Sequence, residues 1–237
     1  MTKNFDKITK KVANMYKKYP YPSPSTEVNQ TNELLNLLRI FELESNIQLK
    51  NKKFLDAGSG SGHRIVNVAQ HYKNCNFLGI DISDTSLKIS QTIKNKNNLK
   101  NIQFKKYNLM NPTFNLGKFD FILSMGVLHH LSNPNKGLEN ILKVLKKDGM
   151  IFVYLYGKLG GHKRILNKKL LSLLLNKKKS DYDLGIKLVR DLDMNKFEYG
   201  WNLNFKNKEE EDSLIVDSLL HANEKLYDFN DIHKLFK

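Results

Sequence analysis

The stretch Phe54-Leu55-Asp56-Ala57-Gly58-Ser59-Gly60-Ser61-Gly62-His63 is the most informative part of the chain. It reads as a short apolar strand, a turn with glycine at three alternate positions, and the start of a helix. Glycine has no side chain to keep a ligand away from the backbone, and it accepts positive φ where the chain turns. The turn therefore predicts a site for a flat ligand such as a nucleoside. A dinucleotide-binding loop would place its third glycine at position 63, where this chain has His63, so a nicotinamide-dependent dehydrogenase is disfavoured.

Two acidic residues stand at the ends of predicted neighbouring strands. Asp56 ends the first strand, and Asp81 ends the second, in Phe77-Leu78-Gly79-Ile80-Asp81-Ile82-Ser83. Ligands collect at the carboxyl ends of parallel strands, so the glycine turn and both acids are expected around one crevice. A carboxylate at the position of Asp81 offers two oxygens to the two hydroxyls of a ribose. The alternative for Asp81 is an acid that stabilises the N-terminus of the following helix.

Short apolar runs alternate with helical periods from Lys52 onward, as in a mainly parallel sheet covered by helices. We therefore predict an α/β fold with a Rossmann-like, doubly wound sheet that has helices on both faces. The expected strands are 53–56, 76–81, 101–107, 119–124 and 150–156, and the expected helices between them are 64–72, 85–94 and 136–146. Leu138, Ile141, Leu142 and Leu145 share one face of the last helix, and Gly149 is its expected end.

The order of these motifs resembles that of the class I S-adenosylmethionine-dependent methyltransferases, of the methyltransferase type 11/12-like group. The resemblance covers about residues 52–156 and rests on the turn at 56–62, on Asp81, and on Phe119-Asp120-Phe121-Ile122-Leu123-Ser124-Met125-Gly126-Val127-Leu128-His129-His130-Leu131. It implies S-adenosyl-L-methionine as the cofactor. The residues that it implies for cofactor binding are Asp56, Gly58, Ser59, Gly60, Gly62, Asp81, Ile82, Asn108, Leu109 and Met125.

Each of the main positions has a role in this resemblance. Asp81 would hold the ribose hydroxyls, Gly58 and Gly60 would pass the methionine part, and Met125 would approach the methionine end. Ile82 would lie against adenine. The third strand of the family usually ends with an acid that takes the adenine amino group, whereas this chain has Asn108, an uncharged acceptor that predicts weaker adenine recognition.

The chain departs from the family pattern after the fifth strand. Members of the family commonly finish the sheet with an antiparallel pair of strands, and no such pair is evident before Lys237. Either the polar stretch 195–205 supplies strands in an unusual place, or the sheet lacks the pair. An incomplete sheet would leave an edge that needs cover, which puts catalytic competence in doubt.

The segments on either side of the predicted core are helical. Residues 1–50 contain two amphipathic helices joined by Tyr19-Pro20-Tyr21-Pro22-Ser23-Pro24, and we expect them to form a lid in which Tyr16, Tyr19 and Tyr21 shield the cofactor or stack on a substrate. Residues 51–157 would be the cofactor-binding core. Residues 158–237 would complete the acceptor side, with a basic amphipathic helix at 158–179 that either packs on the protein or contacts a membrane or nucleic acid. The polar stretch 181–212 is expected to be a loop with room for one short helix.

Composition limits the class of protein. The 237 residues include 39 Lys and Arg against 24 Asp and Glu, a net charge of +15 that attracts polyanions unless it is spread evenly over the surface. The longest apolar run, 150–156, is too short to cross about 30 Å of hydrocarbon as a helix, and the N-terminus has no signal-peptide pattern. The single cysteine, Cys75, favours a reducing compartment, so we expect a cytoplasmic protein.

The predicted function is transfer of a methyl group from S-adenosylmethionine to an O, N or C atom of a small-molecule acceptor. Methylation of RNA is an alternative favoured by the charge, although Ser124-Met125-Gly126-Val127 differs from the Asn/Asp-Pro-Pro-Tyr signature of many nucleobase amine methyltransferases. A non-catalytic S-adenosylmethionine-binding module is another. His129 or His130 is the available general base, but capping or packing in the turn is the favoured explanation for each, so no catalytic residue is assigned and no metal is predicted.

Overall fold

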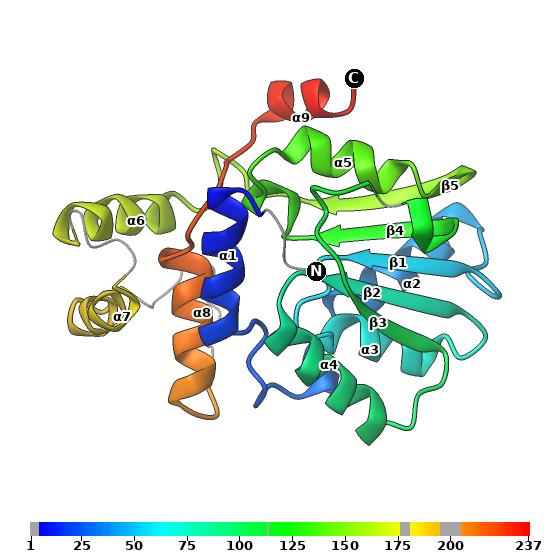
Figure 1. Cartoon of the computed structure of the whole chain (residues 1–237), viewed down its shortest axis with the longest axis horizontal. Helices are drawn as coiled ribbons and strands as arrows, with labels where there is room; N and C mark the ends of the chain where they lie inside the picture. The colour runs from blue at the N-terminus through cyan, green and yellow to red at the C-terminus, as the bar shows by residue number, and fades with distance from the viewer. Residues whose placement is uncertain (1–4, 113, 176–180, 195–204) are drawn as a thin grey trace.

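A computed structural model describes residues 5–112, 114–175, 181–194 and 205–237, with a five-stranded sheet at its centre (Figure 1). The strands are β1 (Lys53–Ala57), β2 (Asn76–Asp81), β3 (Ile102–Lys106), β4 (Phe119–Met125) and β5 (Leu145–Tyr154). They are parallel and have the order β3-β2-β1-β4-β5. The direction of winding reverses between β1 and β4, which confirms the predicted doubly wound α/β fold and makes the carboxyl ends of these strands the expected ligand site.

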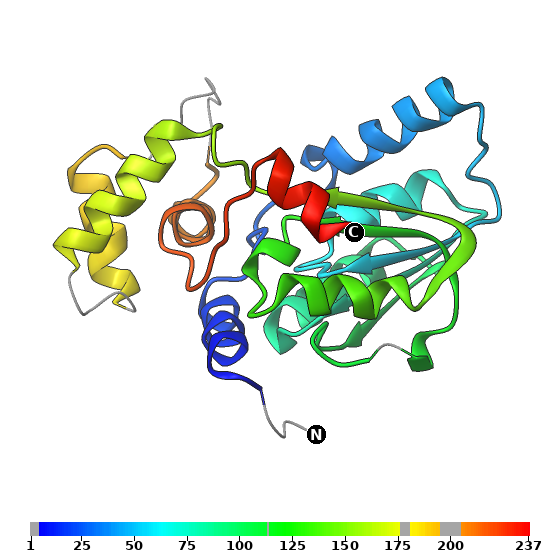
Figure 2. The same cartoon turned by 90° about the horizontal axis from the view of Figure 1, so that it is seen from above.

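Helices cover both faces of this sheet. The core of one face packs beneath α2 (Glu33–Ser45), α3 (His63–His71) and α4 (Asp84–Lys96), and the core of the other beneath α5 (Pro134–Leu142) and α9 (Phe229–Leu235). Figure 2 shows α2 and α5 on opposite sides of the strands. In the first core, the rings of Phe77, Phe54 and Phe121 stack in a row across β2, β1 and β4, with 5.0 Å between successive centroids. These stacked rings fix the register of the central strands.

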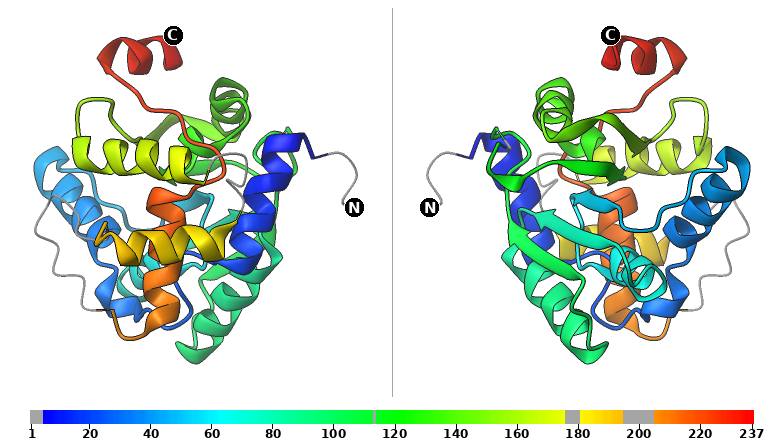
Figure 3. Two further views of the ribbon diagram at one scale, coloured as in Figure 1. Left: turned by 90° about the vertical axis from the view of Figure 1, so that its left-hand side faces the viewer. Right: turned by 90° about the vertical axis from the view of Figure 1, so that its right-hand side faces the viewer.

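Four helices form a third core beyond the carboxyl ends of the strands. They are α1 (Lys7–Lys18), α6 (His162–Leu174), α7 (Tyr182–Asp191) and α8 (Lys208–Leu219), and they bury Met15, Leu171, Val189 and Val216 among others (Figures 1 and 3). Single 3-10 turns occur at Val28–Gln30, Phe114–Leu116 and Leu128–His130. Among the helices that the structure describes, none has the length and apolar character needed to cross a membrane. The helices thus cap the sheet at the edge where a ligand is expected.

The boundary between α5 and β5 differs from the prediction. The helix ends at Leu142, and β5 begins at Leu145, so Gly149 lies inside a strand and does not end the helix. The reason is a non-local pairing: Leu145 is opposite Phe119 in β4, and the register then shifts before Met150 meets Phe121. An irregularity of this kind admits the polar residues that looked like a turn.

The stretch 181–212 was predicted to be a loop with room for one short helix, and its described residues are more helical than that. It contains α7 and the first turn of α8, because Asp181 and Asn207 accept backbone N–H groups as N-caps and Ile186 and Val189 pack inward. Beyond Tyr154, the described residues add only an isolated parallel bridge between Gly157 and Tyr227 to the strand pairing. The stretch 195–205, considered for an extra strand pair, lies outside the described residues except for Phe205.

Candidate functional site

The glycine turn leaves β1 with positive φ at all three glycines: 94° at Gly58, 53° at Gly60 and 81° at Gly62. Backbone N–H groups of Gly58 and Ser59 both donate to the carbonyl of Ile80, at 2.8 and 3.0 Å, so the turn is tied to the end of β2. A Cβ at Gly58 would come within 2.5 Å of the Val127 side chain, and one at Gly60 within 2.5 Å of the Tyr21 carbonyl oxygen. Glycine is therefore required here by the protein's own close contacts as well as by backbone conformation.

Gly62 faces away from the cavity that the other two glycines line. A Cβ there would lie 2.6 Å from the Cβ of Ser90 in α4 and about 3.0 Å from the Phe104 ring. Gly62 therefore allows the turn to pack closely against α4 and β3.

Asp81 holds the turn through hydrogen bonds to both carboxylate oxygens. The N–H of Gly60 donates to Oδ2 at 2.9 Å, and the N–H of Ser83 donates to Oδ1 at 2.8 Å. Burial raises the pKa of Asp81, while these backbone hydrogen bonds oppose that rise. Each carboxylate oxygen can accept a further hydrogen bond, and Asp81 lines the cavity. The side chain is thus oriented before any ligand arrives.

Asp56 lies at the end of β1 and is only 5% exposed. Burial raises its pKa to about 7, opposed by the positive charge of Arg64 and assisted by the negative charge of Asp81. A group with such a pKa responds strongly to a nearby charge, so a cation bound in the cavity would favour its ionised form.

Asn108 follows β3, and its amide orientation is fixed by a neighbour. The N–H of Met110 donates at 3.0 Å to its side-chain oxygen, which keeps a second lone pair for a ligand, and Nδ2 carries two donor hydrogens. Ile82, Leu109 and Met125 line the same cavity and supply apolar surface.

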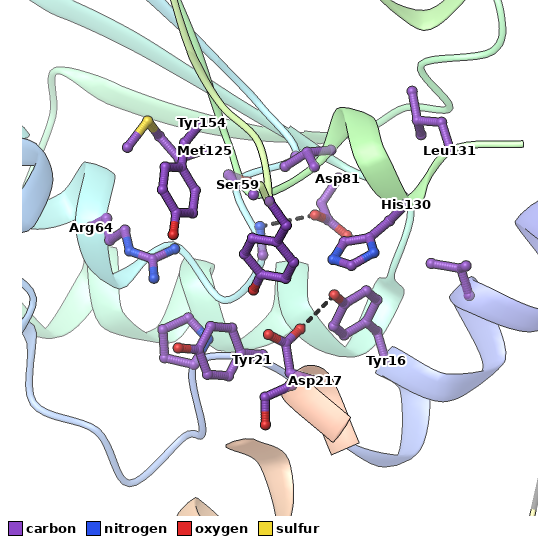
Figure 4. Close-up of a pocket in the computed structure, with 18 of the residues that line it drawn as sticks. Tyr16, Tyr21, Ser59, Arg64, Asp81, Met125, His130, Leu131, Tyr154 and Asp217 are labelled. Atoms are coloured by element: carbon purple, nitrogen blue, oxygen red, sulfur yellow. Dashed lines mark hydrogen bonds between the residues drawn. The ribbon is translucent and has the colours of Figure 1, made fainter. Parts of the chain in front are cut away.

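One cavity of about 990 Å³ brings these residues together (Figure 4). This volume is at the upper end of the range of about 300–1,000 Å³ for ligand pockets. In the close-up, Ser59 and Asp81 lie on one side, Tyr16 and Asp217 lie across from them, and His130 lies between. Of the ten residues predicted to bind the cofactor, nine line the cavity and Gly62 does not; the nine are Asp56, Gly58, Ser59, Gly60, Asp81, Ile82, Asn108, Leu109 and Met125.

The wall opposite the glycine turn carries a chain of hydrogen bonds. The N–H of Asn223 donates to Nδ1 of His221 at 3.1 Å, so the neutral ring carries its proton on Nε2. That Nε2 lies 3.1 Å from the hydroxyl oxygen of Tyr16, whose proton is donated to Asp217 at 2.7 Å. Burial raises the pKa of Asp217 and lowers that of His221. The chain ends on a buried carboxylate that lines the cavity.

His130 presents a free nitrogen to this wall. Its Nδ1 donates to the carbonyl of Asn223 at 2.8 Å, so the neutral ring has its lone pair on Nε2. Burial lowers the pKa of His130, and its ring stacks on that of His221 with centroids 3.5 Å apart. His129, in contrast, is fully buried, does not line the cavity, and has no hydrogen-bond partner for either ring nitrogen among the described residues.

Donor atoms of His130, Asp217 and His221 lie within 4.8 Å of one another, a spacing that suits a metal ion. The Tyr16 hydroxyl already bonds to two of these three residues, and a metal would have to displace it. Asp217 and His221 thus already share protons with Tyr16, while His130 bonds to the Asn223 carbonyl.

Several cavity residues were not predicted from the sequence, and Arg64 and Asp217 are the most informative. Arg64, in the first turn of α3, has its guanidinium carbon 5.8 Å from the centre of the Tyr21 ring and a nitrogen 3.9 Å from Glu33. Its position two residues after the glycine turn could have predicted that Arg64 lies near the ligand site. Asp217 is a lone acid in the apolar run 214–220, which was another. Of the three tyrosines expected over the cofactor, Tyr16 and Tyr21 line the cavity, whereas Tyr19 packs in the third core.

Comparison with known proteins identifies the domain. The family model described as "Methyltransferase domain" matches residues 48–210, more than half of the chain. An uncharacterized protein of Rickettsia prowazekii is 30% identical over 149 residues, which are 62% of this chain and 58% of that protein. A ubiquinone biosynthesis O-methyltransferase of Coxiella burnetii is 28% identical over 119 residues, half of each chain.

Solved structures share the fold. PKMT2 from Rickettsia typhi in complex with AdoHcy has a TM-score of 0.57 and 24% identity, covering 80% of this chain and 38% of that one. The chain also spans only 24% to 58% of the length of the curated relatives that it matches.

Proposed function

Because the chain belongs to the class I S-adenosylmethionine-dependent methyltransferases, we propose that it transfers a methyl group from S-adenosylmethionine to an O, N or C atom of a small-molecule acceptor. One observation carries the proposal: a preoriented carboxylate, Asp81, and a glycine turn face the same cavity, which has room for two reactants. The AdoHcy bound by PKMT2, which has the same fold, supports this choice of cofactor.

The residues at the ends of β2 and β3 fit the adenosine part of this cofactor. Asp81 would accept from the ribose hydroxyls with the lone pairs left over from Gly60 and Ser83. Asn108 would accept from the adenine amino group with the lone pair of its side-chain oxygen that Met110 leaves, and Ile82 and Leu109 would supply apolar surface beside the base.

The methionine part would lie toward Asp56 and Arg64. Asp56 would pair with its ammonium group and Arg64 with its carboxylate, since the two side chains offer the complementary charges in the same cavity. Gly58 and Gly60 would allow the backbone to approach it, and Met125 would lie near the sulfur. The cofactor, when bound, supplies an electrophilic methyl group, so the protein needs to bring no nucleophile of its own.

The acceptor would occupy the opposite end, between the core and the helices that cap it. We propose that residues 51–157 bind the cofactor, that residues 1–50 form a lid over it, and that residues 158–237 complete the acceptor side, since Tyr16, Arg164 and Asp217 reach the cavity from α1, α6 and α8. Holding the reactants in line and excluding water supplies much of the rate enhancement in such transfers. His130, with its free Nε2, is placed to take a proton from a hydroxyl or amine acceptor, and His129 is not.

RNA methylation and a non-catalytic binding module are the competing functions. The basic residues of α6 support RNA binding less than their number suggests, because Arg164 and Lys168 both pair with the buried Glu224 at 3.0 Å and so stabilise the fold.

The single cysteine, Cys75, is buried and fits a reducing compartment, so we propose a cytoplasmic location for the protein.

Calorimetry followed by a transfer assay tests the proposal. Purified chain should bind S-adenosylmethionine and S-adenosylhomocysteine saturably, and radiolabelled methyl groups should then pass to a member of a panel of phenols, amines and short RNAs. Transfer to RNA alone would favour the RNA function, and binding without transfer to any acceptor would favour the module. Absence of binding to both cofactor forms would overturn the proposal.

A further inference from the structure

Two large apolar side chains on neighbouring segments stand almost fully in solvent. Leu159, in the loop between β5 and α6, is 90% exposed, and Phe229, at the start of α9, is 88% exposed. Their segments are tied together by the Gly157–Tyr227 bridge and by ion pairs from Lys158 to the carboxylates of Asp228 and Asp231, at 2.8 and 2.6 Å. The two side chains thus project from one braced platform and are not on loose ends.

Helix α6 continues this apolar surface. Leu166, Leu170 and Leu173 follow one another at spacings of four and three residues on one face, and they are 49%, 43% and 76% exposed. The opposite face buries Leu171 in the third core. Exposed Lys163 and Lys169 lie among the outward leucines, so apolar and cationic side chains share this face.

Leu159, Leu166, Leu170, Leu173 and Phe229 are here named the apolar rim, which adjoins the cavity at Leu159 and at the first turn of α6. Gly157, Gly160 and Gly161, next to Leu159, line the cavity, as do Lys163 and Arg164 in the first turn of α6. Seen from above in Figure 2, α6 and α9 both face the viewer with no other element drawn over them. Among the described residues, the rim therefore has no cover.

We propose that the apolar rim docks on an anionic phospholipid bilayer, with α6 lying in the plane of the membrane interface. Leucines flanked by lysines on an exposed helical face are the pattern of interfacial helices, whose binding combines apolar burial with attraction to anionic headgroups. The net charge of +15 adds a favourable long-range field. Since the rim adjoins the cavity, the acceptor is a lipid-soluble molecule taken from the bilayer; this last point rests on the proposed function.

Vesicle cosedimentation of the full chain tests the docking. Wild type should bind vesicles of mixed phosphatidylcholine and phosphatidylglycerol, bind pure phosphatidylcholine more weakly, and lose affinity as salt is added. The paired change Leu159→Ser and Phe229→Ser should lower the partition coefficient at least about tenfold, because full burial of each such side chain is worth more than a tenfold change in equilibrium. The variant should keep the wild-type thermal unfolding curve, since both residues are in solvent.

The matched control is Leu43→Ser. Leu43 is 77% exposed but lies on α2, on the other side of the molecule from the rim, and this change should leave vesicle binding as it is. Equal losses in the control and the rim variant, or no binding of wild type to anionic vesicles, would overturn the proposal. The proposal would also be overturned if wild type were a dimer in solution and the rim variant a monomer, since the rim would then be an interface between two copies.

Calorimetry with S-adenosylhomocysteine on the same samples separates this proposal from the proposed function. Vesicle binding without binding of that ligand would leave the docking intact and remove the methyltransferase role. Binding of S-adenosylhomocysteine without vesicle binding would leave the methyltransferase role intact and remove the docking.

Discussion

Replacement of Asp81 by Asn is the sharpest test of the cofactor assignment. The carboxylate receives N–H groups from Gly60 and Ser83 at 2.9 and 2.8 Å, one on each oxygen. An asparagine can accept only one of them and must turn its NH₂ group toward the other donor. Hydrogen bonds to a charged group contribute about 1.5–3 kcal/mol, so loss of one from the ribose should weaken S-adenosylhomocysteine binding by about 10- to 100-fold.

The same change also disturbs the turn, so the ligand must be varied as well. The second ligand is an analogue of S-adenosylhomocysteine that lacks the two ribose hydroxyls. We expect wild type to bind this analogue much more weakly than S-adenosylhomocysteine. We expect Asp81→Asn to bind the two ligands with nearly equal affinity. Titration calorimetry on the four combinations gives the coupling energy directly. Asp84→Asn is the control, because Asp84 is exposed, pairs with Lys106 and does not line the cavity. If removal of the hydroxyls costs the same in wild type and in Asp81→Asn, the assignment of Asp81 to the ribose is wrong.

Two further predictions concern the same turn. Burial raises the pKa of Asp56 from 3.8 to about 7, so the stability that its neutral form provides is present below pH 3.8 and is lost as the pH rises toward 7. Asp56→Asn should therefore raise the melting temperature relative to wild type above pH 7, by about 2–4 °C for each kcal/mol recovered, and a difference that does not depend on pH would contradict the cause. Gly58→Ala and Gly117→Ala both force an alanine to adopt positive φ, which costs about 1–2 kcal/mol of stability. Only the Cβ at position 58 meets a neighbour, the Val127 side chain at 2.5 Å. Urea unfolding should show the larger loss for Gly58→Ala, by about 1–3 kcal/mol from overpacking, with partial recovery on adding Val127→Ala; equal losses would show that the contact is unimportant.

The central part of the fold follows from local patterns. Strands β1 to β4 lie within one or two residues of their predicted ranges. Strands β1, β2 and β4 are short, mainly apolar runs that end at a glycine or an acid, whereas β3 alternates apolar and polar residues before Asn108. The glycine turn and Asp81 could be placed in one crevice because a parallel sheet brings strand ends to one edge. Nine of the ten predicted cofactor residues accordingly line one cavity.

What could not be predicted depends on contacts between distant segments. Leu145 continues the spacing of the preceding helix, yet its pairing with Phe119 makes it the first residue of β5. Helix α7 has Ile186 and Val189 at helical spacing, but the surrounding charges made the stretch look irregular. The hydrogen bond from Tyr16 to Asp217 joins residues 201 positions apart, and no local pattern brings two such residues together.

The contacts of Tyr21 and Pro22 with the glycine turn bear on how the domain should be delimited. The family model begins at residue 48, but the carbonyl of Tyr21 accepts the N–H of Ser61 at 3.3 Å, and that of Pro22 accepts its hydroxyl at 2.5 Å. A fragment cut at the family boundary would strip the turn of both acceptors and leave the hydroxyl of a fully buried serine without its carbonyl. The smallest piece suited to binding studies therefore starts before Tyr21, so homology alone sets its edge too late.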